Sequence, residues 1–81
     1  MSLSWKIPVI ISIGEPPADT PISTLQAAAW ALIEDWPHED GPALDHALVV
    51  CTAVMEGKRK PEEARQAFVA AATEAGILVR A

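Results

Sequence analysis

Most of the side chains that could do chemistry lie in one short segment, DWPHEDGPALDHALVVC, at residues 35–51. It holds both histidines and the single cysteine of the chain, together with several carboxylates. The groups of interest are His38, Glu39, Asp40, Asp45, His46 and Cys51. Imidazole, carboxylate and thiolate groups bind zinc, and a thiol beside an imidazole can act as a nucleophile. The segment therefore raises two hypotheses, a metal site and a catalytic dyad.

The spacing of these groups does not require a metal site. His38 and His46 are eight residues apart, whereas metal ligands on one helix are usually three or four residues apart and share a face. Asp45 and His46 are adjacent, and adjacent helical residues point about 100° apart. His38 lies before the expected helix and could approach only through tertiary folding. We therefore predict no bound metal or cofactor, and we keep a metal site at His38, Asp45, His46 and Cys51 as the alternative.

Cys51 has no helical neighbour that would activate its thiol. It follows His46 by five residues, which places the two side chains about 140° apart around a helix. It also falls among apolar residues at helical spacing, where a free cysteine usually acts as a small hydrophobic side chain. We expect His38–Gly41 to form a turn, Asp40 to cap the next helix, and Asp45 and His46 to face water. No catalytic residue is assigned, and a thiol-dependent enzyme is the alternative hypothesis.

Other catalytic signatures do not occur in the sequence. Glu34 and Asp35 are adjacent carboxylates, but they lie at the end of a predicted helix, where solvated side chains are expected. The four glycines are scattered singly, so there is no glycine-rich phosphate loop, and no GxSxG motif marks a serine nucleophile. The basic triplet KRK at residues 58–60 is expected to be a solvated loop. These observations favour binding over catalysis.

The N-terminal part of the chain has the alternating pattern of a strand with one buried face. In the predicted strand 5–14, the apolar positions on this face are Trp5, Ile7, Val9, Ile11 and Ile13. The segment GEPPAD at 14–19 then forms a turn, and residues 20–22 can return as a short second strand. Pro21 has no N–H group to donate, so this second strand is expected at an edge of the sheet.

Two helices are expected next. Ser23 as N-cap and Gln26 three residues later match a capping box for a helix over 24–36, which Pro37 ends. Its inner face is expected to carry Leu25, Ala28, Ala29, Leu32 and Trp36, widened by Trp30 and Ile33. The second helix begins at Pro42, and Gly57 is a plausible left-handed terminator for it. Its apolar stripe is expected at Leu44, Ala47, Leu48, Cys51, Val54 and Met55.

A third helix is expected to begin at Pro61 and to end at Gly76, where Ile77 can make the hydrophobic contact of a Schellman ending. Its buried side is expected to carry Ala64, Ala67, Phe68, Ala71, Ala72 and Ala75. Residues 77–79 could close the chain as a short strand beside the first. The predicted fold class is α+β, with a small antiparallel sheet packed against three α-helices. We expect one domain over residues 1–81, with residues 1–4 as a loose terminus.

The charge of the chain narrows the range of partners. Eleven acidic residues against six basic ones give a net charge of −5. This argues against nucleic acid, which requires a cationic surface, and against anionic membranes. A single cysteine cannot form an internal disulfide, and no signal peptide is recognisable, so a cytoplasmic location is expected.

The ordered motifs along the chain resemble a family of short bacterial proteins grouped as domain of unknown function 982, which are described mainly from rhizobia and related alphaproteobacteria. The resemblance rests on W..PV from Trp5, AAAWALIEDWP ending at Pro37, AL..C..V.EG ending at Gly57, and AR.AF..AA.EAGI ending at Ile77. It implies a small stand-alone bacterial protein and supplies no catalytic residue. The proline-rich EPPADTPI segment departs from the family pattern, which leaves the length of the second strand open.

The sequence predicts an interaction module that pairs with itself or with another protein. Alanine-rich helices bury little area per residue, so pairing two copies would cover leftover apolar surface. The residues expected at this surface are Trp30 and Val49. In a variant of this hypothesis, acidic side chains steer a basic partner toward the domain. These side chains are Glu34, Asp35, Glu39, Asp40 and Asp45.

Overall fold

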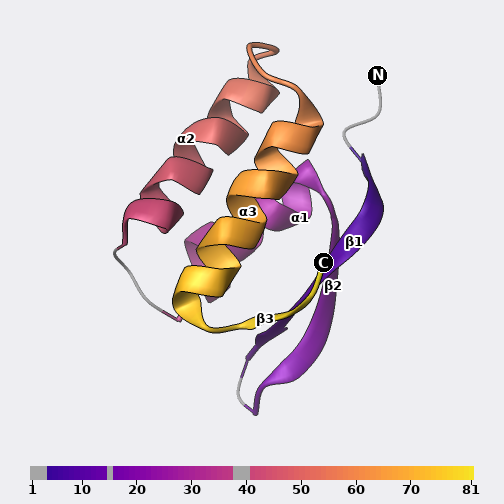
Figure 1. Cartoon of the computed structure of the whole chain (residues 1–81), viewed down its shortest axis with the longest axis vertical. Helices are drawn as coiled ribbons and strands as arrows, with labels where there is room; N and C mark the ends of the chain where they lie inside the picture. The colour runs from indigo at the N-terminus through magenta and orange to yellow at the C-terminus, as the bar shows by residue number, and fades with distance from the viewer. Residues whose placement is uncertain (1–3, 15, 38–40) are drawn as a thin grey trace.

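The computed structural model describes residues 4–14, 16–37 and 41–81. Its elements follow the order β1 (Ser4–Ile13), β2 (Ala18–Thr24), α1 (Leu25–Trp30), η1 (Ala31–Asp35), α2 (Pro42–Met55), α3 (Pro61–Ala75) and β3 (Leu78–Arg80). The predicted α+β class is confirmed. In Figure 1, α2 and α3 lie side by side, with α1 behind them and the sheet beyond α3. No described helix has both the length and the hydropathy needed to cross a bilayer.

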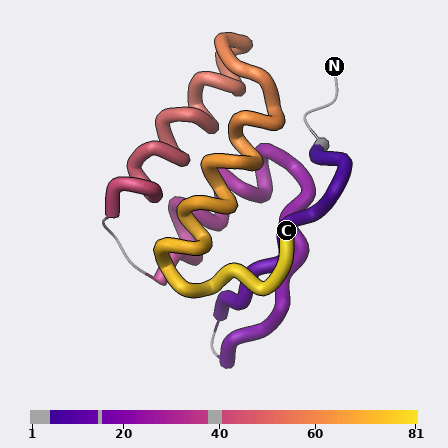
Figure 2. The backbone as a smooth tube through the Cα atoms, in the orientation of Figure 1, coloured from indigo at the N-terminus to yellow at the C-terminus, as the bar shows by residue number. Residues whose placement is uncertain are grey.

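The three strands form one antiparallel sheet in the order β2-β1-β3. The predicted edge position of the strand that contains Pro21 is confirmed, although β2 extends beyond residues 20–22 at both ends. The closing strand is also confirmed, and it begins at Leu78, one residue later than expected. Figure 2 shows the last segment of the chain returning to the first. The sheet therefore joins both ends of the described chain.

The pairing of β1 with β2 is irregular near its start. Ser4 pairs with Thr24, but the next pair is Val9 with Ile22, so β1 carries extra residues between these two points. Such a bulge turns side chains away from the alternating pattern. The predicted burial of Ile7 is wrong, because its side chain is 60% exposed. Ser4 itself belongs to β1, inside the segment expected to be a loose terminus.

Helix α1 begins one residue later than the capping box suggests. Thr24, rather than Ser23, is the N-cap, and its Oγ1 accepts a hydrogen bond of 3.1 Å from the Ala27 N–H. The helix then widens into the π-helical η1, and Trp36 is extended where Pro37 ends the helix, as expected.

The predicted inner face of this helix is only partly correct. Leu25, Ala28 and Leu32 are buried, and Ala31 is buried as well. The expectation that Trp30 and Ile33 widen this face is wrong, because they are 63% and 67% exposed. The helix thus presents two large apolar side chains to solvent.

Replacing Thr24 with alanine is expected to lower the free energy of unfolding by about 1 kcal/mol, because the Ala27 N–H loses its acceptor. The matched control is Ser23→Ala, which removes the exposed hydroxyl next to it and should change stability by less than about 0.5 kcal/mol. Urea denaturation of both variants measures the difference. Equal losses would contradict the assignment of Thr24 as the cap.

The start of α2 is capped by a carboxylate that is distant in the sequence, that of Glu74. Gly41 is the N-cap, Pro42 occupies the first turn as predicted, and Glu74 Oε2 from the end of α3 accepts a hydrogen bond of 3.2 Å from the Ala43 N–H. The predicted cap, Asp40, lies outside the described residues. Negative charge at this position is favoured by the helix dipole. The contact ties the end of one helix to the beginning of the other.

The apolar stripes of α2 and α3 are largely as predicted. On α2, Val50 is buried although it was not expected to be, and Met55 is 53% exposed although burial was expected. On α3, every predicted position is buried except Ala75, which is half-buried. Gly76 has the left-handed conformation, and the Ile77 N–H donates to the Ala72 carbonyl at 3.0 Å, which is the predicted Schellman ending.

Three aromatic rings join the sheet to the helices. Phe68 on α3 is fully buried. Its ring centroid lies 5.7 Å from that of Trp5 on β1 and 5.5 Å from that of Trp36 after η1. Tilted and edge-to-face pairs at these distances add stability beyond the area they bury. Phe68 is therefore the centre of the core.

Candidate functional site

Helix α2 carries Asp45, His46 and Cys51, and it places the thiol on a different side from the other two groups. Asp45 and His46 are exposed, while Cys51 lies on the inner side of the same helix and is 2% exposed. Burial raises the pKa of the Cys51 thiol from 9.0 to about 11. A thiol in this state is a weak nucleophile at neutral pH, because only the thiolate reacts. The described residues therefore support a structural role for Cys51.

A metal site finds no donor set in the described part of the chain. Within residues 4–14, 16–37 and 41–81, no group of three or more His, Cys, Asp or Glu side chains is arranged to hold an ion. His38, Glu39 and Asp40 lie outside these ranges. Asp45 and His46 remain neighbours on the exposed side of α2, as the helical geometry predicts.

Trp30 stands at an open hollow of about 430 Å³ between β2 and α1, which we call the Trp30 hollow. Its wall carries apolar side chains and one carboxylate: Ile13, Pro21, Ile22, Ala27, Trp30, Ala31 and Asp35, with the polar residues Thr20, Thr24 and Gln26. Ile33 is exposed three residues beyond Trp30. The exposed indole of Trp30 thus lies at the edge of an open cavity on the same surface of the domain.

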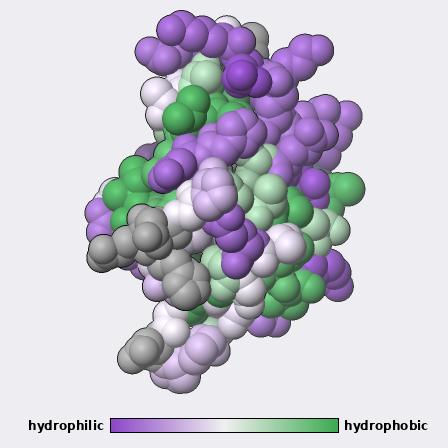
Figure 3. Space-filling model, turned by 60° about the vertical axis from the view of Figure 1, so that its left-hand side comes forward, coloured by the Kyte–Doolittle hydropathy of each residue, from purple (hydrophilic) through white to green (hydrophobic). Residues whose placement is uncertain are grey.

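Val49 does not belong to this surface. It lies on α2, 64% exposed, one helical turn after Asp45, and neither residue lines the Trp30 hollow. Figure 3, which brings the α2 side forward, shows hydrophobic residues at the surface between hydrophilic ones. The predicted surface residues therefore form two groups: Trp30 with Glu34 and Asp35, and Val49 with Asp45. Glu39 and Asp40 lie outside the described residues.

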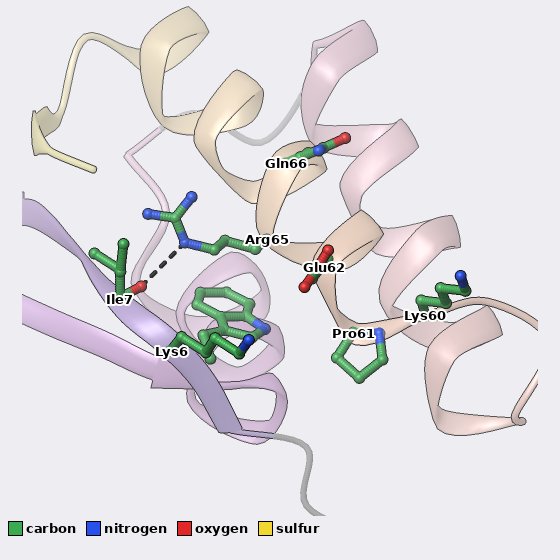
Figure 4. A pocket seen from close by; sticks show the side chains of 8 residues that line it. Lys6, Ile7, Lys60, Pro61, Glu62, Arg65 and Gln66 are labelled. Carbon is green, nitrogen blue, oxygen red and sulfur yellow. Dashed lines mark hydrogen bonds between the residues drawn. The ribbon is translucent and has the colours of Figure 1, made fainter.

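A second hollow, of about 540 Å³, was not predicted from the sequence. It lies between the start of β1 and the start of α3, and we call it the β1–α3 groove. Its lining residues are Trp5, Lys6, Ile7, Lys60, Pro61, Glu62, Arg65 and Gln66. In Figure 4, Arg65 reaches across to β1, where its Nε–H donates a hydrogen bond of 3.0 Å to the Ile7 carbonyl. This contact joins the two walls of the groove.

The N-terminal end of α3, which lies at the groove, is fixed by hydrogen bonds between Lys60 and Glu63. The Lys60 N–H donates to Glu63 Oε2 at 2.8 Å, and the Glu63 N–H donates to the Lys60 carbonyl at 3.0 Å. The hydrogen bond from the Lys60 backbone lowers the pKa of Glu63, with a smaller effect from Arg59. Lys60 belongs to the KRK triplet at residues 58–60, which the sequence predicts to be a solvated loop. Only the fold shows that it stands opposite Lys6.

Comparisons with known proteins agree with the architecture. The family described as protein of unknown function (DUF982) matches residues 7–79. An NMR structure of an Agrobacterium tumefaciens protein, a structural-genomics target, is 33% identical, with a TM-score of 0.78. The alignment covers 98% of this chain and 78% of that one. No curated protein matches the sequence.

Proposed function

The chain belongs to the DUF982 family of proteins of unknown function, and from that premise we propose that it is a non-enzymatic interaction module that pairs with a second copy of itself through the Trp30 hollow. The observation that carries this proposal is the exposure of Trp30 beside that hollow. Exposed tryptophan is costly for a small domain and is enriched at the centres of protein interfaces.

The shape of this surface suits a twofold pair. In an isologous dimer the same patch meets itself, so a patch that holds both a projecting group and a cavity can be self-complementary. Trp30 and Ile33 project, and the hollow beside them is lined by Ile13, Ile22 and Ala27. One copy's Trp30 would occupy the hollow of the other. Both rings would then lose the water that now surrounds them.

The charge of this surface sets the expected salt dependence. Asp35 lines the hollow, Glu34 is its neighbour in the sequence, and none of the described lysines and arginines lines the hollow. Two copies would bring like charges together, so added salt should strengthen the pairing by screening the repulsion. A basic protein partner steered by the same carboxylates would instead bind less tightly as salt rises. Salt dependence therefore distinguishes the two kinds of partner.

We further propose a cytoplasmic location, which the single, unpaired thiol supports. We propose no membrane or nucleic-acid partner, because the net charge of −5 disfavours binding to anionic surfaces. An enzymatic role has less support among the described residues, because Cys51 is buried and the exposed His46 lies on the other side of its helix.

Trp30→Ala tests the pairing. Sedimentation equilibrium at 0.05 and 0.5 M NaCl is expected to show a dimer whose dissociation constant falls with salt. Trp30→Ala should raise that constant by about 10-fold to 100-fold, as for a hot-spot residue. The matched control is Val49→Ala, which shortens an equally exposed side chain outside the hollow and should leave the constant unchanged.

The proposal fails in two ways that are easy to recognise. A monomer at millimolar concentration in both salts would exclude self-pairing. A dimer that weakens equally in Trp30→Ala and Val49→Ala would place the contact elsewhere. Trp30 is largely exposed, so its replacement by the best helix former should leave the fold intact.

A further inference from the structure

The indole nitrogen of Trp5 is a buried donor without an acceptor. The residue is 7% exposed, and among the described residues its Nε1 is the one buried side-chain nitrogen or oxygen that has no hydrogen-bond partner. Burying an N–H group without a partner is unfavourable, so nearly all such groups in folded proteins are satisfied. Trp5 also lines the β1–α3 groove. Nε1 itself has almost no accessible surface, so an acceptor bound in the groove would remove this cost once the groove side chains that cover the nitrogen move aside.

The groove concentrates positive charge in a chain that is acidic overall. Lys6, Lys60 and Arg65 are three of the six basic residues, and all three line the groove. The ion pairs among the described residues join Lys58 to Glu56 and Arg59 to Glu63, so none of these three cations has a carboxylate partner there. The positive end of the α3 dipole lies at the same place. These features favour an anion.

The remaining walls restrict the kind of anion. Ile7 is turned outward by the β1 bulge and is 60% exposed, and Pro61 and the Trp5 ring add apolar surface. Glu62 also lines the groove, and its charge disfavours a ligand with several negative charges. In Figure 4, Lys6 and Ile7 lie on one side of the groove and Pro61 and Glu62 on the other. The volume of about 540 Å³ lies within the range of small-molecule sites.

We propose that the β1–α3 groove binds a small organic monocarboxylate with an apolar body. One carboxylate oxygen accepts a hydrogen bond from Trp5 Nε1–H, with the charges of Lys6 and Lys60 beside it. The apolar body lies against Ile7 and Pro61, and Gln66 offers its amide at the rim. This site is separate from the Trp30 hollow, since the two have no described residue in common. If no carboxylate bound in the groove, the proposed pairing through the Trp30 hollow would be unaffected.

The test is a titration of the full chain with hexanoate and benzoate, followed by the ¹H–¹⁵N signals of the three tryptophan side chains. Trp5→Phe identifies the Trp5 signal, because the variant keeps an aromatic ring and lacks the N–H. A saturable downfield shift of this signal is expected, while the Trp30 and Trp36 signals stay in place. Inorganic phosphate, which has no apolar body, should bind at least about 10-fold more weakly.

Charge variants test the walls of the groove. Lys6→Gln combined with Lys60→Gln should weaken binding of hexanoate by about 10-fold or more, as expected for lost charge-assisted contacts. The matched control is Lys58→Gln, which removes the same charge from an exposed position outside the groove and should change affinity less than twofold.

Three results would overturn the proposal. The first is the absence of a saturable Trp5 shift at 10 mM of either acid. The second is phosphate binding as tight as hexanoate binding. The third is an equal loss of affinity in Lys58→Gln and in the double variant. Because Lys6, Lys58 and Lys60 are all exposed, these variants are expected to fold, so a negative result would not reflect unfolding.

Discussion

Phe68→Ala is expected to lower the free energy of unfolding by about 3–5 kcal/mol, because it removes a fully buried ring and leaves a cavity. The loss includes two aromatic contacts, with Trp5 and with Trp36. Small domains are stable by only about 5–15 kcal/mol, so much of the stability of this chain would disappear. Urea denaturation monitored by far-ultraviolet circular dichroism measures the change.

The control for this variant is Phe68→Leu. Leucine keeps an apolar side chain at the centre of the core, so the variant should lose clearly less stability than Phe68→Ala. Tryptophan fluorescence gives an independent readout, since two of the three indoles contact the ring. A loss below about 1 kcal/mol for Phe68→Ala would mean that this ring is not the centre of the core.

The buried thiol predicts a loss of stability at alkaline pH. In the folded chain the pKa of Cys51 is about 11, against 9.0 for an ordinary thiol. Below pH 9 both the folded and the unfolded chain carry the thiol proton, so this group gives no pH dependence. Between pH 9 and pH 11 the unfolded chain loses the proton first, and stability should fall by about 2–3 kcal/mol.

Cys51→Ala isolates this effect from other alkaline titrations. The variant loses some core packing, but the difference between its stability and that of the natural chain should shrink as the pH rises from 9 to 11. Alkylation gives a second measurement: iodoacetamide should label the native thiol at pH 8 far more slowly than the urea-unfolded one. Rapid labelling of the folded chain would show an accessible thiolate and would contradict the burial of Cys51.

Local sequence signals predicted much of the fold. Pro37, Gly57, Pro61 and Gly76 end or begin helices in the structure as expected, because proline and glycine act on the backbone at their own positions. The predicted apolar stripe of α3 was also correct except at Ala75, since one helix packs one face against its neighbours. These features depend on few residues, which is why the sequence alone suffices for them.

The errors at Ile7, Trp30 and Ile33 arise where the repeat of an element is interrupted. The bulge in β1 turned Ile7 outward, and the one-residue shift of the α1 cap together with the π-helical η1 left Trp30 and Ile33 exposed. Neither the bulge nor the wide turn has a signature in the residue types, because both depend on tertiary packing.

The candidate sites were harder to predict than the fold. The segment at 35–51 holds most of the reactive residue types of the chain, yet its thiol belongs to the core. The β1–α3 groove joins residues near position 6 with residues near position 60. No spacing rule relates such distant positions. An isolated lysine in a strand and a lysine before a helix each look like ordinary surface residues until the fold brings them together.

The central place of β1 has a consequence for the kinetics of folding. Its two neighbours come from very different distances along the chain: β2 follows after a short turn, whereas β3 follows all the helices. The β1–β2 hairpin has low contact order and should form early, while docking of β3 closes a long loop and should come late. Amides of β3 should therefore exchange with solvent through openings that leave the hairpin protected.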